Sequence, residues 1–167
     1  MKKLKKWSFI ITFIAIIQGG VICFLYRRMK RENTHCYELS MSNFKLQQYY
    51  KLVCEWLEQK QQNEHITDYF KKHDIQKIAL YGMGTLGWLL YEDLKDSEID
   101  IVCAYDWNAA IMGNPIEMKS PGEMQNGIEA VDAILVTPIG DFYGINKYIT
   151  QYTDIPVLSL EDVIYSR

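Results

Sequence analysis

The sequence predicts an α/β fold with a short parallel sheet of about four strands, and three observations predict it. An apolar run at residues 78–81 ends in a glycine-rich turn, as expected of a strand buried on both faces. Leucines then recur at helical spacing from Leu86 to Leu94. Further apolar runs at residues 101–105, 133–137 and 155–159 alternate with helical patterns, which is typical of parallel sheets.

The glycine-rich turn gives this fold a more specific interpretation. Gly82, Gly84 and Gly87 have the G-x-G-x-x-G spacing of Rossmann-like dinucleotide-binding folds. In such folds the first glycine permits a tight turn, the second lets a pyrophosphate approach the backbone, and the third lets the helix pack closely on its strand. The free N–H groups and positive dipole end of that helix hold the anion. The turn therefore predicts a nucleotide site.

A carboxylate follows at the expected place. Asp106 ends the run at residues 101–105 and lies 19 residues after Gly87, where an acid meets the ribose hydroxyls of a bound nucleotide. The alternative is a solvated aspartate that caps the end of a strand.

The candidate ligand contacts lie in loops at the carboxyl ends of the strands, because ligands of open α/β sheets bind there. The candidate cofactor-binding residues are Gly82, Met83, Gly84, Thr85, Leu86, Gly87, Asp106, Trp107, Asn108, Thr137 and Pro138. The expected ligand is NAD(P) or a nucleotide-sugar. No metal is expected, since the histidines and cysteines form no ligand cluster. The large ring of Trp88, directly after the third glycine, would narrow the site if it turned toward it.

The N-terminal part predicts a membrane anchor. Residues 7–26 form a run of 20 residues without charge, with four basic residues on each flank, long enough to span a bilayer as one helix. The equal flanks leave the orientation open, and the nucleotide-binding interpretation favours a single-pass cell-membrane protein with its C-terminal domain in the cytoplasm. The expected organisation is a basic tail at 1–6, a transmembrane helix at 7–26, a basic and polar linker at 27–42, an amphipathic helical segment at 43–74 that forms a helical hairpin, and a Rossmann-like domain at 75–167.

Charge excludes one class of partner. Residues 33–167 contain ten Lys or Arg against twenty Asp or Glu, a net charge of −10, so a nucleic acid would be repelled.

The helical segment offers a different surface. Its predicted apolar face consists of Leu46, Tyr49, Tyr50, Val53, Trp56 and Leu57, and its start is expected at Ser42 or Asn43. This Tyr/Trp helix is expected to pack against the α/β domain or against a second copy, and it offers a docking face for a partner enzyme.

No catalytic residue is predicted, and whether the protein is an enzyme stays open. The Tyr-x-x-x-Lys spacing of short-chain dehydrogenases occurs at Tyr143 and Lys147, but also at two other places in the chain. Only 91 residues run from Lys77 to the end, so a separate substrate domain is not expected. A degenerate methyltransferase-like domain is a further alternative, since it shares the glycine turn and the acid.

Several motifs together carry a resemblance to a family. They are the Tyr/Trp-rich helix, the stretch from Ile78 to Gly87, the pair Tyr105 and Asp106, the run Val136, Thr137 and Pro138, and the closing stretch from Val157 to Asp162. Residues 44–167 resemble small bacterial Rossmann-like domains associated with cell-surface polysaccharide and glycan assembly. The resemblance implies a nucleotide or nucleotide-sugar site at the glycine turn and Asp106, and a role as an accessory to a glycan-assembly enzyme. A Rossmann scaffold that has lost its ligand and mediates protein contacts at the membrane is the alternative.

Overall fold

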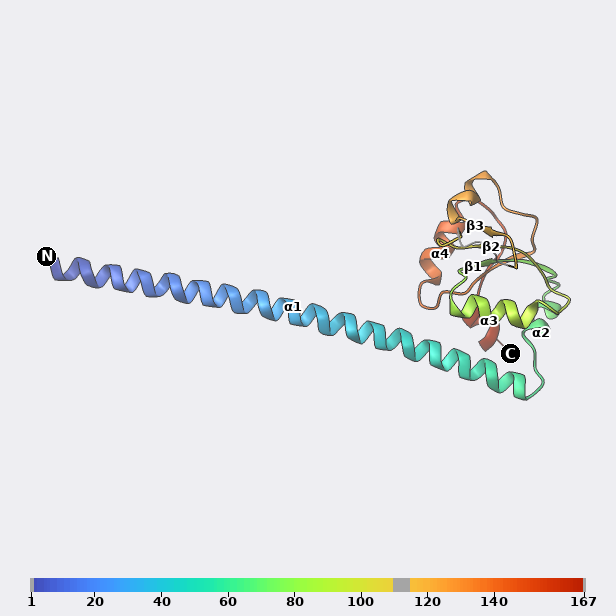
Figure 1. Ribbon diagram of the computed structural model, residues 1–167, viewed down its shortest axis with the longest axis horizontal. Coiled ribbons are helices and arrows are strands. Elements are labelled where there is room, and N and C mark those ends of the chain that lie inside the picture. Colours follow the sequence, from blue (N-terminus) through green and yellow to red (C-terminus); the bar gives the residue numbers. More distant parts are fainter. Residues whose placement is uncertain (1, 110–114, 167) are drawn as a thin grey trace. The chain divides into compact units, whose positions relative to one another are not determined.

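The computed structural model describes the backbone of residues 2–109 and 115–166, and within those ranges the side chains from Gln18 onward. The chain forms two compact units, Met1–Leu46 and Gln47–Arg167. One long helix, α1 (Lys2–Gln61), begins in the first unit and ends in the second (Figure 1).

The continuity of α1 corrects one expectation. Residues 27–42, expected to form a linker, are helical throughout, so no new helix starts at Ser42 or Asn43. The physical reason is the absence of glycine and proline from residue 21 to residue 81, which leaves nothing to interrupt the helix. The helix ends only where Asn63 takes a φ of 60°, the left-handed conformation common after helix ends.

The expected membrane segment, residues 7–26, lies mostly in the part of α1 whose side chains are not described. Within the described part of the chain, no helix combines the length and the apolar character needed to cross a bilayer.

The second unit contains a sheet of five parallel strands in the order β3-β2-β1-β4-β5. This is one strand more than predicted, and the extra strand is a two-residue edge strand in the segment between Pro115 and Pro121. The order matches the first five strands of the classic doubly wound nucleotide-binding sheet. The strands are β1 (Lys77–Tyr81), β2 (Asp100–Tyr105), β3 (Met118–Lys119), β4 (Ala133–Val136) and β5 (Val157–Ser159).

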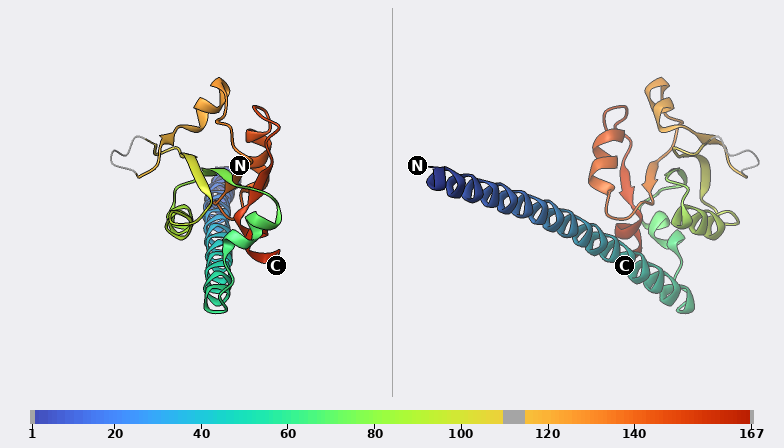
Figure 2. Two further views of the ribbon diagram at one scale, coloured as in Figure 1. Left: turned by 90° about the vertical axis from the view of Figure 1, so that its right-hand side faces the viewer. Right: turned by 60° about the vertical axis from the view of Figure 1, so that its left-hand side comes forward.

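Helices cover both faces of the sheet (Figure 2). Along β1, Ile78 and Leu80 pack into one core cluster while Ala79 and Tyr81 pack into another, the alternation of a strand buried on both sides. The first cluster joins the end of α1 to α2 (Ile66–Lys72), α3 (Thr85–Leu94) and α5 (Leu160–Tyr165), and the second includes α4 (Phe142–Ile149) and the 3₁₀ helix η1 (Pro121–Asn126). The crossover helices α3 and α4 therefore lie on opposite faces, with the strand order reversing between β1 and β4.

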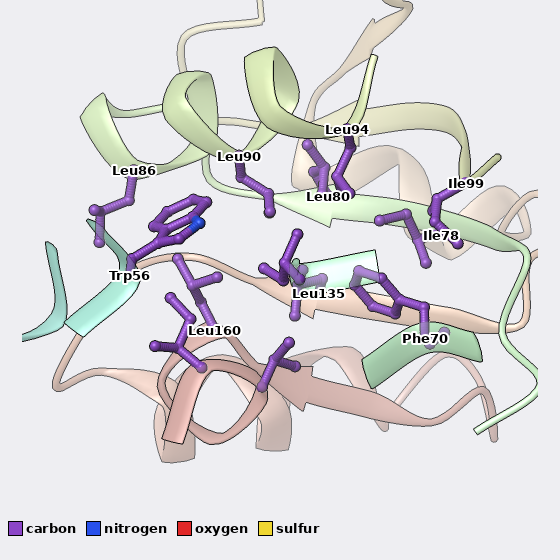
Figure 3. Packing of buried hydrophobic residues seen from close by; sticks show 14 of the residues in the cluster. Trp56, Phe70, Ile78, Leu80, Leu86, Leu90, Leu94, Ile99, Leu135 and Leu160 are labelled. Atoms are coloured by element: carbon purple, nitrogen blue, oxygen red, sulfur yellow. The ribbon is translucent and has the colours of Figure 1, made fainter. Parts of the chain in front are cut away.

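The last turns of α1 form part of the first core cluster. Trp56 is 6 % exposed and lies among Leu86, Leu90 and Leu160 (Figure 3). Its indole Nε1 donates a hydrogen bond to Asp93 Oδ2 at 2.9 Å, and Lys60 pairs with the same carboxylate.

The buried face of α1 is only partly the predicted one: Trp56 is buried and Tyr49 and Val53 pack against the first core cluster, but other predicted members are exposed. Leu52 is fully buried, whereas Tyr50 is 71 % and Leu57 is 54 % exposed. Gln59 is also buried, and its side-chain amide donates to the Ile164 carbonyl of α5 at 2.8 Å. The face that meets the sheet is thus rotated toward Leu52 and Gln59, which the apolar pattern did not indicate.

Candidate functional site

The candidate site lies at the carboxyl edge of the sheet, where β1, β2 and β4 end. The loops after these strands bring Gly82, Asp106 and Thr137 into one hydrogen-bonded group. This edge flanks the point between β1 and β4 where the strand order reverses, the usual ligand position in such sheets.

Gly82 forms the tight turn that the sequence predicted. Its φ is +94°, a region that residues with a Cβ rarely adopt. A Cβ there would also lie 2.8 Å from Cγ and Cδ of Pro138. Its N–H donates to the Tyr105 carbonyl at 2.8 Å, which ties the turn to the end of β2. Both conformation and space therefore require glycine.

Gly87 has the packing role expected of the third glycine. It is buried in the first turn of α3, where a Cβ would fall far inside van der Waals contact with the carbonyl oxygen of Gly82. Only glycine lets α3 approach the strand that precedes it this closely.

Gly84 differs from both. Its φ of −72° and ψ of −164° suit any residue, and a Cβ built there would meet nothing within 4 Å. Gly84 is exposed at the N-cap of α3 and makes no side-chain cap, so the first N–H groups of the helix have no cap side chain to bind. Neither conformation nor packing requires glycine at this position, where Ser, Asp or Asn would cap the helix at least as well.

The Trp88 ring does not fill this open space. It is half-buried against the first core cluster and contacts the Tyr91 ring edge-on, with ring centroids 5.8 Å apart. No Trp88 atom comes within 4 Å of the built Cβ at Gly84.

Asp106 binds the turn itself. Its Oδ2 accepts from the Met83 N–H at 2.6 Å, and its Oδ1 accepts from the Asn108 N–H at 2.8 Å. A carboxylate has about four acceptor positions, so further hydrogen bonds to ligand hydroxyls remain open to it. The expected ribose-binding acid is therefore close to the turn, and it also stabilises the turn.

Thr137 also supports the turn. Its side chain is buried, and its hydroxyl donates to the Gly82 carbonyl at 2.6 Å, while its N–H donates to the Tyr81 carbonyl at 3.0 Å. Together with Pro138 it packs against Gly82. These contacts direct both residues toward the protein backbone.

The remaining candidates divide by exposure. Thr85, Trp107 and Asn108 are exposed, whereas Met83 and Leu86 are buried in the first core cluster. Met83 anchors the turn through its side chain, a role that the sequence reasoning did not give it although its apolar character suggested burial. At the end of β1, burial raises the pKa of Tyr81, so its phenol stays protonated at neutral pH.

The structure gives no sign of a metal site in residues 2–109 and 115–166, where no group of three or more His, Cys, Asp or Glu side chains gathers in a suitable arrangement. Comparisons of the chain with protein-family models, with curated proteins and with solved structures found no match.

Proposed function

We propose that this protein is a membrane-anchored Rossmann-like domain that binds a dinucleotide or nucleotide-sugar as an accessory to cell-envelope polysaccharide biosynthesis. The amides at the start of α3 would hold the diphosphate, and Asp106 would accept hydrogen bonds from the ribose hydroxyls.

Gly84 is the observation that carries the proposal. Gly82 and Gly87 are explained by the fold, but Gly84 has an ordinary conformation and open space around it. A ligand whose phosphate lies against the backbone at this point is a physical reason for having no side chain there. Its position at the N-terminus of a ten-residue helix gives that phosphate favourable N–H groups and a favourable dipole.

Gly84→Ala is expected to weaken nucleotide binding while leaving the fold intact. The added methyl group would occupy the phosphate position, so affinity should fall at least tenfold, about 1.4 kcal/mol. The unfolding free energy should change by no more than about 1 kcal/mol, since alanine is only a poorer N-cap than glycine. Thermal shift and calorimetry of wild type and variant with NAD, NADP, UDP-sugars and S-adenosylmethionine measure both quantities.

Gly84→Ala is a more specific test of the ligand site than Asp106→Ala. Asp106 also accepts a hydrogen bond from the Met83 amide, so removing its carboxylate would loosen the turn itself. Equal affinity in wild type and the Gly84 variant would place the nucleotide elsewhere on the protein. A shift with S-adenosylmethionine alone would favour the methyltransferase-like alternative.

The ligand-free scaffold is the second candidate, and the contacts of Asp106 and Thr137 favour it. Both side chains, expected to contact a ligand, already hydrogen-bond to the turn. If none of these nucleotides shifts the melting temperature of the wild-type protein, the ligand-free scaffold is supported. Such a scaffold would dock a partner enzyme through exposed side chains of the Tyr/Trp helix.

The anchor belongs to the same proposal and rests on the uncharged run at residues 7–26 with its basic flanks. The full chain should stay in the membrane fraction after alkaline carbonate extraction, whereas a chain that begins at residue 27 should be released. Release of the full chain by carbonate would contradict the anchor. Fusions of a cytoplasm-active reporter to the C-terminus test the proposed cytoplasmic location of the nucleotide-binding domain.

A further inference from the structure

A row of apolar side chains runs along the described part of the first unit and is exposed to solvent. Ile22 and Leu46 are each 67 % exposed, Met29 is 61 % and Leu39 is 53 % exposed. Ile22 and Leu25 belong to the proposed membrane span, but Met29, Leu39 and Leu46 lie beyond it. A helix in water gains nothing from such exposed apolar side chains, so their exposure calls for a partner. The full row consists of Ile22, Leu25, Met29, Cys36, Leu39 and Leu46.

The spacing of the row identifies the kind of partner. Steps of three and four residues place Ile22, Met29 and Cys36 at a positions of a heptad repeat, and Leu25, Leu39 and Leu46 at d positions. The repeat extends over 25 residues, whereas the other exposed apolar side chains described in the first unit, Val21, Phe24 and Tyr26 and then Tyr37, Met41 and Phe44, form two shorter groups. A sustained heptad pattern is typical of a coiled coil.

The flanking residues favour a second copy of this chain. The g positions hold Arg28, His35 and Ser42, and in a parallel, in-register pair they would face the e positions of the second copy, at Asn33, Ser40 and Gln47. No two like charges meet between these g and e positions. The charged residues Lys30, Arg31, Glu38 and Lys45 fall at outer b and c positions, away from it.

Two polar residues interrupt the row and fix its geometry. Asn43 is at an a position, where one asparagine favours a two-stranded parallel coiled coil in a single register. Glu32 is at a d position, where the carboxylates of the two copies would face each other and weaken the seam. Its pairing with the Arg28 guanidinium, 3.0 Å from Arg28 Nε to Glu32 Oε1, offsets part of that cost.

We propose that residues 22–46 of α1 form a parallel, in-register, two-stranded coiled coil with a second copy of this chain. The seam is made of the a and d residues, with Asn43 facing Asn43 of the second copy. The interaction lies outside the glycine turn and does not depend on a nucleotide.

Cys36 provides the test, because a parallel coiled coil brings the two copies of an a residue within reach of a disulfide. We expect the full chain carrying Cys23→Ala and Cys54→Ala, in detergent micelles, to form a covalent dimer on treatment with diamide. The two thiols lose two electrons and two protons to form one S–S bond, and diamide is reduced to the hydrazine. The remaining cysteine, Cys103, is buried.

The matched control moves the thiol by one residue. Adding Cys36→Ala and Tyr37→Cys places it at the outer b position, where Tyr37 is 66 % exposed, and cross-linking should fall at least tenfold. Adding Cys36→Ala and Asn43→Cys returns it to an a position and should restore the dimer. Equal cross-linking at positions 36 and 37, or none at position 36, would overturn the proposal.

Sedimentation of the uncross-linked chain gives an independent measurement. Glu32→Leu should lower the dimer dissociation constant at least tenfold, since it replaces a charge in the seam with an apolar side chain. Glu38→Leu, the same change at an outer position, should leave the dissociation constant within twofold of wild type. Equal effects of the two substitutions, or a monomeric wild type at micromolar concentration, would refute the coiled coil.

Discussion

Gly87→Ala is expected to lower the unfolding free energy by about 3 kcal/mol or more. The new methyl group would overlap the carbonyl oxygen of Gly82, a backbone atom that cannot rotate away. Alanine is a better helix former than glycine by about 1 kcal/mol, but this gain is smaller than the cost of moving α3 off its strand. Urea unfolding followed by circular dichroism measures the difference.

The same substitution in another helix is the control. Gly144 lies within α4, and a Cβ there would make only an ordinary contact, 3.6 Å from Asp141 Oδ1. Gly144→Ala should therefore stabilise the protein by about 0.5–1 kcal/mol, the opposite sign. If both variants are stabilised, then α3 does not pack on Gly82 as described.

Trp56→Ala is expected to cost about 3–5 kcal/mol, the range for removing a large buried aromatic side chain. The indole is 6 % exposed, contributes to the core on the α3 side of the sheet and donates to Asp93. Thermal and urea unfolding measure the loss. Trp56→Phe keeps most of the apolar contact and removes the hydrogen bond, so it should cost less than the alanine variant.

Leu57→Ala, the neighbouring residue on the same helix, is the matched control. Its side chain is 54 % exposed, so the expected loss is below about 1 kcal/mol. Similar losses at positions 56 and 57 would mean that the end of α1 is not part of the core.

The strands were predictable because their signal is local. The buried strands β1, β2 and β4 are short apolar runs that end at turn residues or an acid, and the sequence placed them within a residue or two. The 3₁₀ helix η1 was missed, since Pro121 and Gly122 resemble an irregular loop. The prolines at 115 and 121 did indicate a short edge strand at residues 116–119, and β3 lies there. Its two-residue length depends on its pairing with β2, which no local pattern reports.

Helix α1 is longer than predicted because its polar residues were interpreted as an irregular linker. Residues 33–42 are mostly polar, but they contain neither glycine nor proline, and a helix needs a stop signal in order to end. The buried face of α1 was only partly predicted, for a different reason. Apolar residues occur on two sides of the helix, and only the position of the sheet decides that Leu52 is buried while Tyr50 is not.

The candidate site was predictable as a set of backbone positions, while its side-chain contacts were not. Glycine spacing indicated the turn and the helix after it. The hydrogen bond from the Met83 amide to Asp106 joins residues 23 apart in sequence, and the bond from Thr137 to Gly82 joins residues 55 apart. Such contacts depend on how three strand ends meet, which spacing along one chain does not encode.

The buried amide of Gln59 and the indole of Trp56 have an evolutionary consequence. Both side chains belong to the α/β core. A gene fusion that carries only the βαβ region into a new protein would therefore expose the core residues that the end of α1 covers. The transferable module begins near Gln47, so the last four or so turns of α1 must be inherited together with the sheet. Any ancestor that exchanged its N-terminal helix for another would have had to keep this stretch, and relatives with different N-termini should diverge upstream of it.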